Sequence, residues 1–137
     1  MGEVRVKVKL INAADEFMAR RGKIDAGEIR VYEADAMVDT GAVQTVIPVD
    51  VLKMLGLETP RQSGVEYADG RKEVVPVSEG IVVEIQNRAT NDEALVLGDE
   101  VLISQTILEK LDLHVDCANQ KVIPNPAHPD QAVTKVK

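Results

Sequence analysis

The chain has 137 residues, of which 45% are hydrophobic and 28% charged, and its formal net charge is −7. This length corresponds to one domain, and the composition is that of a globular protein rather than of a disordered chain. A surplus of acidic side chains repels phosphate backbones and anionic lipid headgroups. The composition therefore disfavours nucleic-acid binding and binding to a membrane surface.

Composition also limits metal chemistry and cellular location. A single cysteine, Cys117, excludes an internal disulfide, and with two histidines it is too little for a closed zinc site. The first ten residues alternate charge with valine and lack the apolar centre of a signal peptide. No apolar run approaches membrane-spanning length. We expect a cytoplasmic protein without metal or cofactor.

Strands dominate the predicted elements of the first half. Valine, which favours strands, occurs 21 times in the chain. Val4–Leu10 alternates apolar and charged residues, which predicts a strand with one buried face. A polar excursion with at most a short helical turn is expected over 12–27. Further strands are predicted at 29–34, 36–38 and 45–47.

Two short helices are predicted, each directly after a strand. Pro48 suits the first turn of the first helix and Gly56 its end. Ser104 is a favourable N-cap for the second, whose apolar face carries Ile107, Leu108 and Leu111. The segments 46–57 and 102–113 align without gaps at a constant offset of 56 residues, with matching apolar positions. Either any two strand–helix junctions share this pattern, or the domain consists of two related halves.

A hairpin is predicted in the middle of the chain. Asp69-Gly70 separates strand-like runs at 65–68 and 71–77, and an Asp-Gly pair favours a type I′ turn with positive φ at both central residues. Later strands are predicted at 81–85, 94–97, 101–103, 113–115 and 121–123. Prolines from Pro124 onward indicate a domain over 1–124 and a C-terminal tail over 125–137.

An ionisable carboxylate follows an apolar strand at Asp39-Thr40-Gly41. The tripeptide alone predicts only a polar turn between strands. Its apolar flanks, 36–38 and 45–47, favour a partly buried loop. A carboxylate there needs hydrogen-bond donors, and the backbone N–H groups of Thr40, Gly41 and Ala42 are close to it in sequence.

The run Val38-Asp39-Thr40-Gly41-Ala42, followed by Thr45-Val46-Ile47-Pro48, resembles the retroviral-type (retropepsin-like) aspartic proteases and their small bacterial and archaeal relatives. Residues 67–71 are similar to that family's flap hairpin, and 101–116 to its second loop and helix. The resemblance covers about residues 4–124. It implies an all-β fold with two short helices, in which each chain forms a closed β-barrel half of an acid protease. One departure is Ser104, where the family usually has glycine.

The resemblance also implies a site and an activity. The implied catalytic residues are Asp39, Thr40 and Gly41, and the implied contacts to a peptide or protein substrate are Ala42, Tyr67, Ala68, Asp69 and Gly70. Peptide hydrolysis by carboxylates needs two of them sharing one proton. The chain has one Asp-Thr-Gly, so we expect a homodimer that pairs Asp39 with its symmetry mate. The strands Val4–Leu10 and Lys121–Ile123 are expected at the interface, because unpaired edges seek partners.

Three functions remain open from the sequence. The chain is an aspartic endopeptidase, a catalytically silent module that holds an extended peptide by strand addition, or a dimerisation domain in which Asp39 is structural. Tyr67 either covers a substrate or only packs across the hairpin.

The remaining polar residues have simpler interpretations. His114 and Cys117 would face opposite sides of a strand, so Cys117 is interpreted as structural rather than nucleophilic. The acidic pairs Asp15-Glu16 and Asp92-Glu93 are interpreted as loop charges rather than metal ligands, and His128 as solvated.

Overall fold

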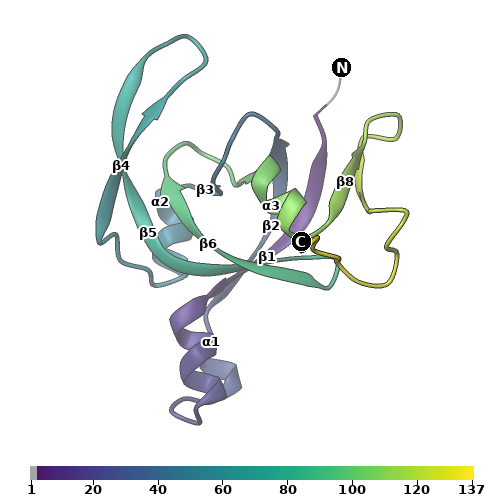
Figure 1. Cartoon of the computed structure of the whole chain (residues 1–137). Helices are drawn as coiled ribbons and strands as arrows, with labels where there is room; N and C mark the ends of the chain where they lie inside the picture. The colour runs from purple at the N-terminus through teal and green to yellow at the C-terminus, as the bar shows by residue number, and fades with distance from the viewer. Residues whose placement is uncertain (1–2) are drawn as a thin grey trace.

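A closed barrel of six strands forms the centre of the computed structural model, which describes residues 3–137 (Figure 1). The described residues form nine strands, which are β1 (Arg5–Asn12), β2 (Val31–Asp39), β3 (Val46–Ile47), β4 (Arg61–Glu66), β5 (Lys72–Ile85), β6 (Arg88–Val96), β7 (Leu102–Ser104), β8 (Leu113–Asp116) and β9 (Lys121–Pro124). The barrel consists of β1, β2, β7, β3, β6 and β5. The helices are α1 (Ala13–Arg20), α2 (Val49–Met54) and α3 (Gln105–Lys110), with a 3₁₀ turn, η1, at Ala26–Glu28. None of the helices in this described part is long and apolar enough to cross a membrane.

The barrel closes because β1 pairs on two sides. The strand order is β1-β2-β7-β3-β6-β5-β4, and β1 also pairs with β5. The β2–β7 and β3–β6 pairs are parallel, and the other pairs of this sheet are antiparallel. The predicted all-β fold is confirmed. The prediction that Val4–Leu10 offers an unpaired edge is wrong, because β1 pairs with β2 along its length and with β5 from Lys9 to Asn12.

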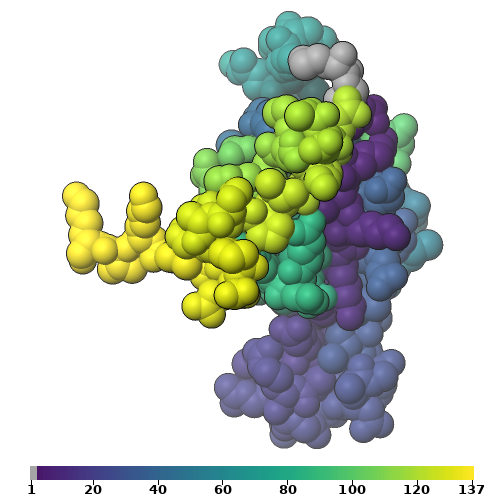
Figure 2. Space-filling model, turned by 90° about the vertical axis from the view of Figure 1, so that its right-hand side faces the viewer, coloured from purple at the N-terminus to yellow at the C-terminus, as the bar shows by residue number. Residues whose placement is uncertain are grey.

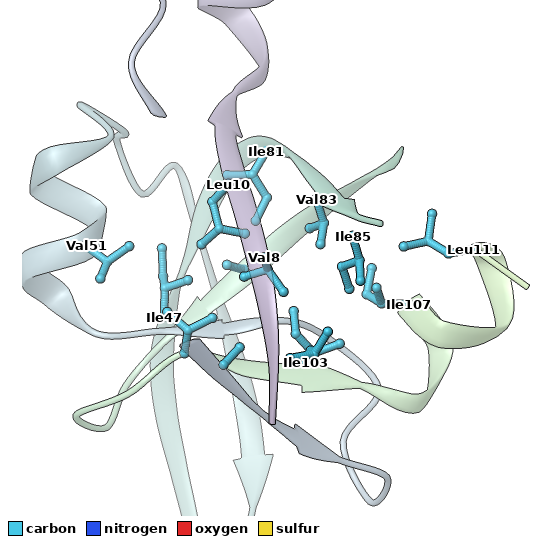
Figure 3. Close-up of a cluster of buried hydrophobic side chains, with 14 of the residues drawn as sticks. Val8, Leu10, Ile47, Val51, Ile81, Val83, Ile85, Ile103, Ile107 and Leu111 are labelled. Atoms are coloured by element: carbon cyan, nitrogen blue, oxygen red, sulfur yellow. The ribbon is translucent and has the colours of Figure 1, made fainter. Parts of the chain in front are cut away.

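The alternation of apolar and charged residues that predicted the first strand also describes how β1 packs. Val6, Val8 and Leu10 are buried and point into the barrel, whereas Arg5 and Lys7 are exposed. Side chains from the strands and from α2 and α3 fill the interior (Figure 3), among them Leu10, Ile47, Val51, Ile81, Val83, Ile85, Ile103, Ile107 and Leu111. Each of these buried side chains stabilises the fold by about 1.5–3 kcal/mol relative to an exposed position.

The polar excursion contains a full helix, which the sequence analysis expected as a turn at most. The Asn12 side chain caps α1 by accepting from the Asp15 N–H at 3.0 Å and donates to the Leu55 carbonyl at 2.7 Å. The Asp15 carboxylate accepts two bonds from the Arg30 guanidinium, at 2.8 and 2.9 Å. Its interpretation as a loop charge is therefore wrong. In Figure 1, α1 projects below the barrel, away from the β4–β5 hairpin.

The turn of the β4–β5 hairpin differs from the predicted type. In the β4–β5 hairpin only Gly70 has positive φ, +88°, and its N–H donates to the Tyr67 carbonyl at 2.9 Å. The predicted type I′ turn at Asp69-Gly70 is therefore wrong, and a three-residue loop with glycine in the left-handed position replaces it. Positive φ at both central residues occurs instead between β5 and β6, at Gln86 (+52°) and Asn87 (+66°).

The two similar segments of the sequence have the same local structure and lie side by side. Val46 of β3 pairs with Leu102 of β7, and each strand leads into a short helix. The helices end at Gly56 and Asp112, which both have positive φ (+64° and +56°) and lie 56 positions apart. This agreement favours the interpretation of two related halves.

The chain after β9 folds back onto the barrel before it extends away (Figure 2). Arg88, which is buried, donates to the carbonyls of Leu111, Asp112 and His128 at 3.0, 2.8 and 2.6 Å. The His128 ring nitrogen Nδ1 lies 2.6 Å from Asp112 Oδ2. The expectation that His128 is solvated is therefore wrong.

Candidate active site

Asp39 is the last residue of β2, where the strand meets the loop that leads to β3. The parallel ladder with β7 places Asp39 opposite Ser104. The Gly41 N–H donates to Asp39 Oδ1 at 3.0 Å, and the Ala42 N–H donates to the Asp39 carbonyl at 3.1 Å. The half-buried carboxylate is thus held by the backbone of its own loop. Of the three backbone donors expected to stabilise the carboxylate, only that of Gly41 reaches it.

The surface of this loop is open. Thr40 is exposed, and within residues 3–137 its hydroxyl forms no side-chain hydrogen bond. A Cβ at Gly41 would lie 3.4 Å from Asp39 Oδ1, so glycine keeps a methyl group away from the carboxylate. Val43 is 73% exposed. The Val43 side chain and the Thr40 hydroxyl therefore flank the carboxylate on an exposed face.

Ser104 fits the position where the resembled family usually has glycine. Its φ is −83°, which any L-residue adopts, so the backbone does not require glycine there. Its Oγ accepts from the Ile107 N–H at 3.2 Å and caps α3, as the sequence predicted. The next residue, Gln105, donates its N–H to the Ala42 carbonyl at 3.3 Å. The start of α3 therefore supports the Asp39 loop.

Asp92 holds the far end of the Asp39 loop through Thr45. Thr45 is fully buried, and both its N–H and its hydroxyl donate to Asp92 Oδ2, at 3.0 and 2.7 Å. Asp92 lies on β6, so its interpretation as a loop charge is wrong. The alternation of Thr90, Asp92 and Ala94 toward the inside is the signal that could have identified it, because an inward polar residue needs a partner.

The β4–β5 hairpin, with its tip at residues 67–71, turns one face toward the barrel. Directly opposed residues share a face, and Val75 is buried, so its partner Ser63 and the neighbouring Val65 and Tyr67 lie on this inner face. Tyr67 Oη donates to the Glu73 carboxylate at 2.6 Å, which raises the pKa of Tyr67 above its ordinary value. The Arg71 guanidinium stacks 4.5 Å above the Tyr67 ring.

The tip of this hairpin and the Asp39 loop lie at the same end of the molecule (Figure 1). Ala68, Asp69 and Gly70 are exposed at the tip. Within residues 3–137 no hydrogen bond joins the hairpin to the loop. The structure therefore brings the two groups of implied site residues to one end of the barrel without joining them.

A cavity of about 290 Å³ lies beside the loop and the terminal hairpin β8–β9. Its lining is mainly apolar and includes Val4, Met37, Val38, Thr40 and Val115. Cys117, which is exposed, also lines this cavity. Across the described part of the chain, no group of three His, Cys, Asp or Glu side chains is placed to hold a metal ion.

Comparison with known proteins identifies a matching family and similar folds. A family model described as aspartyl protease matches residues 20–106, which include Asp39, Thr45, Asp92 and Ser104. The structure is similar to EIAV protease complexed with the inhibitor HBY-793, with a TM-score of 0.52 and 16% identity over 79% of this chain and 86% of that chain. It is also similar to simian foamy virus (mac) protease, with a TM-score of 0.48 and 15% identity over 76% of this chain and 90% of that chain.

No match was found among curated proteins. At 16% identity the likeness to the EIAV enzyme concerns the fold. The family match is stronger, because it covers well over half of the sequence and includes the whole Asp39 loop. The chain belongs to the aspartyl protease family and has the retropepsin-like fold.

Proposed function

We propose that the protein is an aspartic endopeptidase that works as a homodimer, with one Asp39 from each copy. The observation that carries this proposal is the Asp39 loop. It holds a single half-buried carboxylate by the Gly41 N–H, next to an exposed Thr40, in a chain that contains Asp-Thr-Gly only once. One such loop supplies half of a carboxylate pair, and a two-fold axis supplies the other half.

The chemistry follows from the repulsion between two close carboxylates. Like charges about 3 Å apart do not both ionise, so the pair keeps one proton. The ionised Asp39 takes a proton from water, whose oxygen attacks the peptide carbonyl carbon. The Asp39 of the partner subunit gives its proton to the carbonyl oxygen. The first Asp39 then gives the proton that it took from water to the peptide nitrogen, and the Asp39 of the partner subunit takes a proton from a hydroxyl of the tetrahedral intermediate as the C–N bond breaks. The products are a free carboxyl group and a free amine, and the pair returns to its starting state.

Each part of the loop has a role in this proposal. The Gly41 N–H keeps the carboxylate in place, and the Thr40 hydroxyl hydrogen-bonds to the other copy. The exposed surface around Thr40 and Val43 supports these contacts, since Val43 is 73% exposed and the Thr40 hydroxyl forms no hydrogen bond within residues 3–137. In the part of the chain that the structure describes, β8 and β9 pair only with each other, so their outer edges are available to join those of a second copy.

The flap hairpin, which comprises β4, residues 67–71 and the first part of β5, covers the bound peptide. Its inner face carries Val65 and Tyr67, which offer apolar contact to an extended substrate. Ala68, Asp69 and Gly70 form the tip, and Ala42 contributes to the floor beneath the substrate. Pairing the substrate backbone with a strand edge would leave its side chains alternating between the two walls.

The test is cleavage of a peptide library over pH 3–8 in ¹⁸O-labelled water, with Asp39→Asn as the matched variant. We expect wild type to produce fragments with ¹⁸O at the new carboxyl terminus and Asp39→Asn to produce none. Asn keeps the shape of the side chain but provides neither the base nor the acid proton. Equal cleavage by both proteins would contradict the proposal. Peptide binding without cleavage by wild type would identify a catalytically silent binding module instead.

A further inference from the structure

We propose that Asp92 is a positioning residue for the Asp39 loop, acting through Thr45. This inference rests on the proposed function and deepens it, because it assigns a residue on the neighbouring strand β6 to the same site. Asp92 Oδ2 accepts both the N–H and the hydroxyl of Thr45, at 3.0 and 2.7 Å. Thr45 has no exposed surface, so neither donor has water as an alternative partner.

The contact replaces a missing rung of the β-ladder. β3 begins at Val46 and pairs in parallel with β6, and the Thr45 carbonyl accepts the Leu95 N–H at 2.9 Å. Among residues 3–137 the Thr45 N–H has no backbone acceptor, and the Asp92 carboxylate takes that place. An ionised acceptor forms shorter and stronger hydrogen bonds than a neutral one, so the Asp92 carboxylate holds Thr45 strongly.

The Asp39 loop therefore has two fixed ends. The β2–β7 ladder fixes Asp39 itself, and Asp92 fixes Thr45, six residues later. Between them, the Gln44 side chain donates to the Glu93 carbonyl at 2.9 Å, and the Ala42 carbonyl accepts from α3. Without the contact between Asp92 and Thr45, the loop would be free to shift relative to the Asp39 carboxylate that it supports.

A shift of this kind affects turnover more than substrate affinity. Catalytic groups need placement within a fraction of an ångström, and a misplacement of about 1 Å costs up to about 100-fold in rate. Asp92→Ala removes both hydrogen bonds, and we expect kcat to fall at least about 10-fold with KM changed less than about 2-fold. Asp92→Asn keeps an acceptor oxygen in the same place. We expect it to retain activity within about 3-fold of wild type, since only the charge is lost.

Two further variants separate positioning from stability. Asn91→Ala removes an exposed side chain of the same strand and should leave kcat unchanged. Thr45→Val removes only the hydroxyl and should lower kcat, and combining it with Asp92→Ala should add little further loss, because both act on one contact. All rates are referred to the folded fraction, measured by circular dichroism at the assay temperature.

Amide hydrogen exchange tests the proposal independently of activity. The Gly41 N–H is bonded to Asp39, and in Asp92→Ala we expect the exchange of residues 40–45 to rise at least about 10-fold while the barrel strands keep their protection. Unchanged exchange there, or a kcat of Asp92→Ala equal to that of Asn91→Ala, would overturn the role of Asp92. If wild type cleaves nothing, the proposed function fails, and the exchange result alone decides whether Asp92 holds the loop.

Discussion

The N-cap of α3 can be tested by a series of substitutions, and the structure indicates how much each should lower the stability of the fold. Ser104 is fully buried, and its Oγ is the acceptor for the Ile107 N–H at 3.2 Å. Ser104→Ala removes this acceptor and keeps the size of the side chain nearly constant. Loss of an N-cap costs about 1 kcal/mol, and the buried N–H left unpaired raises this toward about 2 kcal/mol.

Ser104→Gly and Thr106→Ala are compared with Ser104→Ala in the same experiment. Glycine also lacks the acceptor, but as an N-cap it costs only a few tenths of a kcal/mol relative to serine. Thr106 is half-buried in the same helix and its hydroxyl makes no hydrogen bond in the described chain, so Thr106→Ala should leave stability unchanged or raise it slightly. The order of stability expected is therefore wild type, then Ser104→Gly, then Ser104→Ala.

Urea unfolding at one fixed protein concentration measures these differences, because any dimerisation would make stability depend on concentration. Ser104→Ala should lower the free energy of unfolding by about 1–2 kcal/mol without changing the slope against urea. A loss below about 0.3 kcal/mol would show that the hydroxyl does not cap the helix. Ser104→Gly more damaging than Ser104→Ala would contradict the order of stability expected from helix capping.

Three further predictions concern the turns and the C-terminal contacts. Gly70→Val should strain a φ of +88° and loosen the flap tip, so that KM rises several-fold. The unfolding midpoint of the barrel should stay within about 1 °C of wild type, and unchanged hydrogen exchange of the tip amides would contradict this prediction. Asn87→Gly should raise stability by about 0.5–1 kcal/mol in urea unfolding, because Asn87 has positive φ in a two-residue turn, and a loss would refute that turn assignment. The pKa of Asp112 is lowered to about 2, mainly by its hydrogen bond from Asn125, so its ionised form stabilises the fold above the unfolded pKa of 3.8 and this contribution is lost as pH falls toward 2. Asp112→Asn should therefore be less stable than wild type at pH 7 and approach it near pH 2.5 in thermal unfolding; an equal difference at both pH values would contradict this.

Local patterns predicted those elements whose residues interact with near neighbours. The alternation in Val4–Leu10 identified a strand, and Gly56 and Ser104 marked the boundaries of two helices, because a cap or a stop acts within one turn. The Asp-Thr-Gly run identified the loop of the candidate site for the same reason. Its main observed hydrogen bond joins Gly41 to Asp39, two residues apart.

The features that the sequence analysis missed depend on partners far along the chain. Asp15 binds Arg30, and Asp92 binds Thr45, across 15 and 47 positions. The local sequence does not identify the partner of either carboxylate, although the alternation along β6 places Asp92 on the inner face. The closing β1–β5 ladder joins residues that are farther apart still, such as Lys9 and Glu84, and it makes the first strand an interior strand rather than the expected free edge. The turn types were missed because Asp-Gly suits more than one hairpin loop, whereas Gln-Asn lacks the glycine that usually marks a type I′ turn.

The pairing of Asp39 across two copies is tested most directly by mixing wild type with Asp39→Asn. Total protein is held constant, subunits are allowed to exchange fully, and peptide cleavage is measured as the wild-type fraction is lowered. If both carboxylates are needed, activity follows the square of that fraction and falls to about one quarter in an equal mixture, because only dimers of two wild-type copies are active. A linear fall to about one half would show that each copy acts alone and would contradict the shared site.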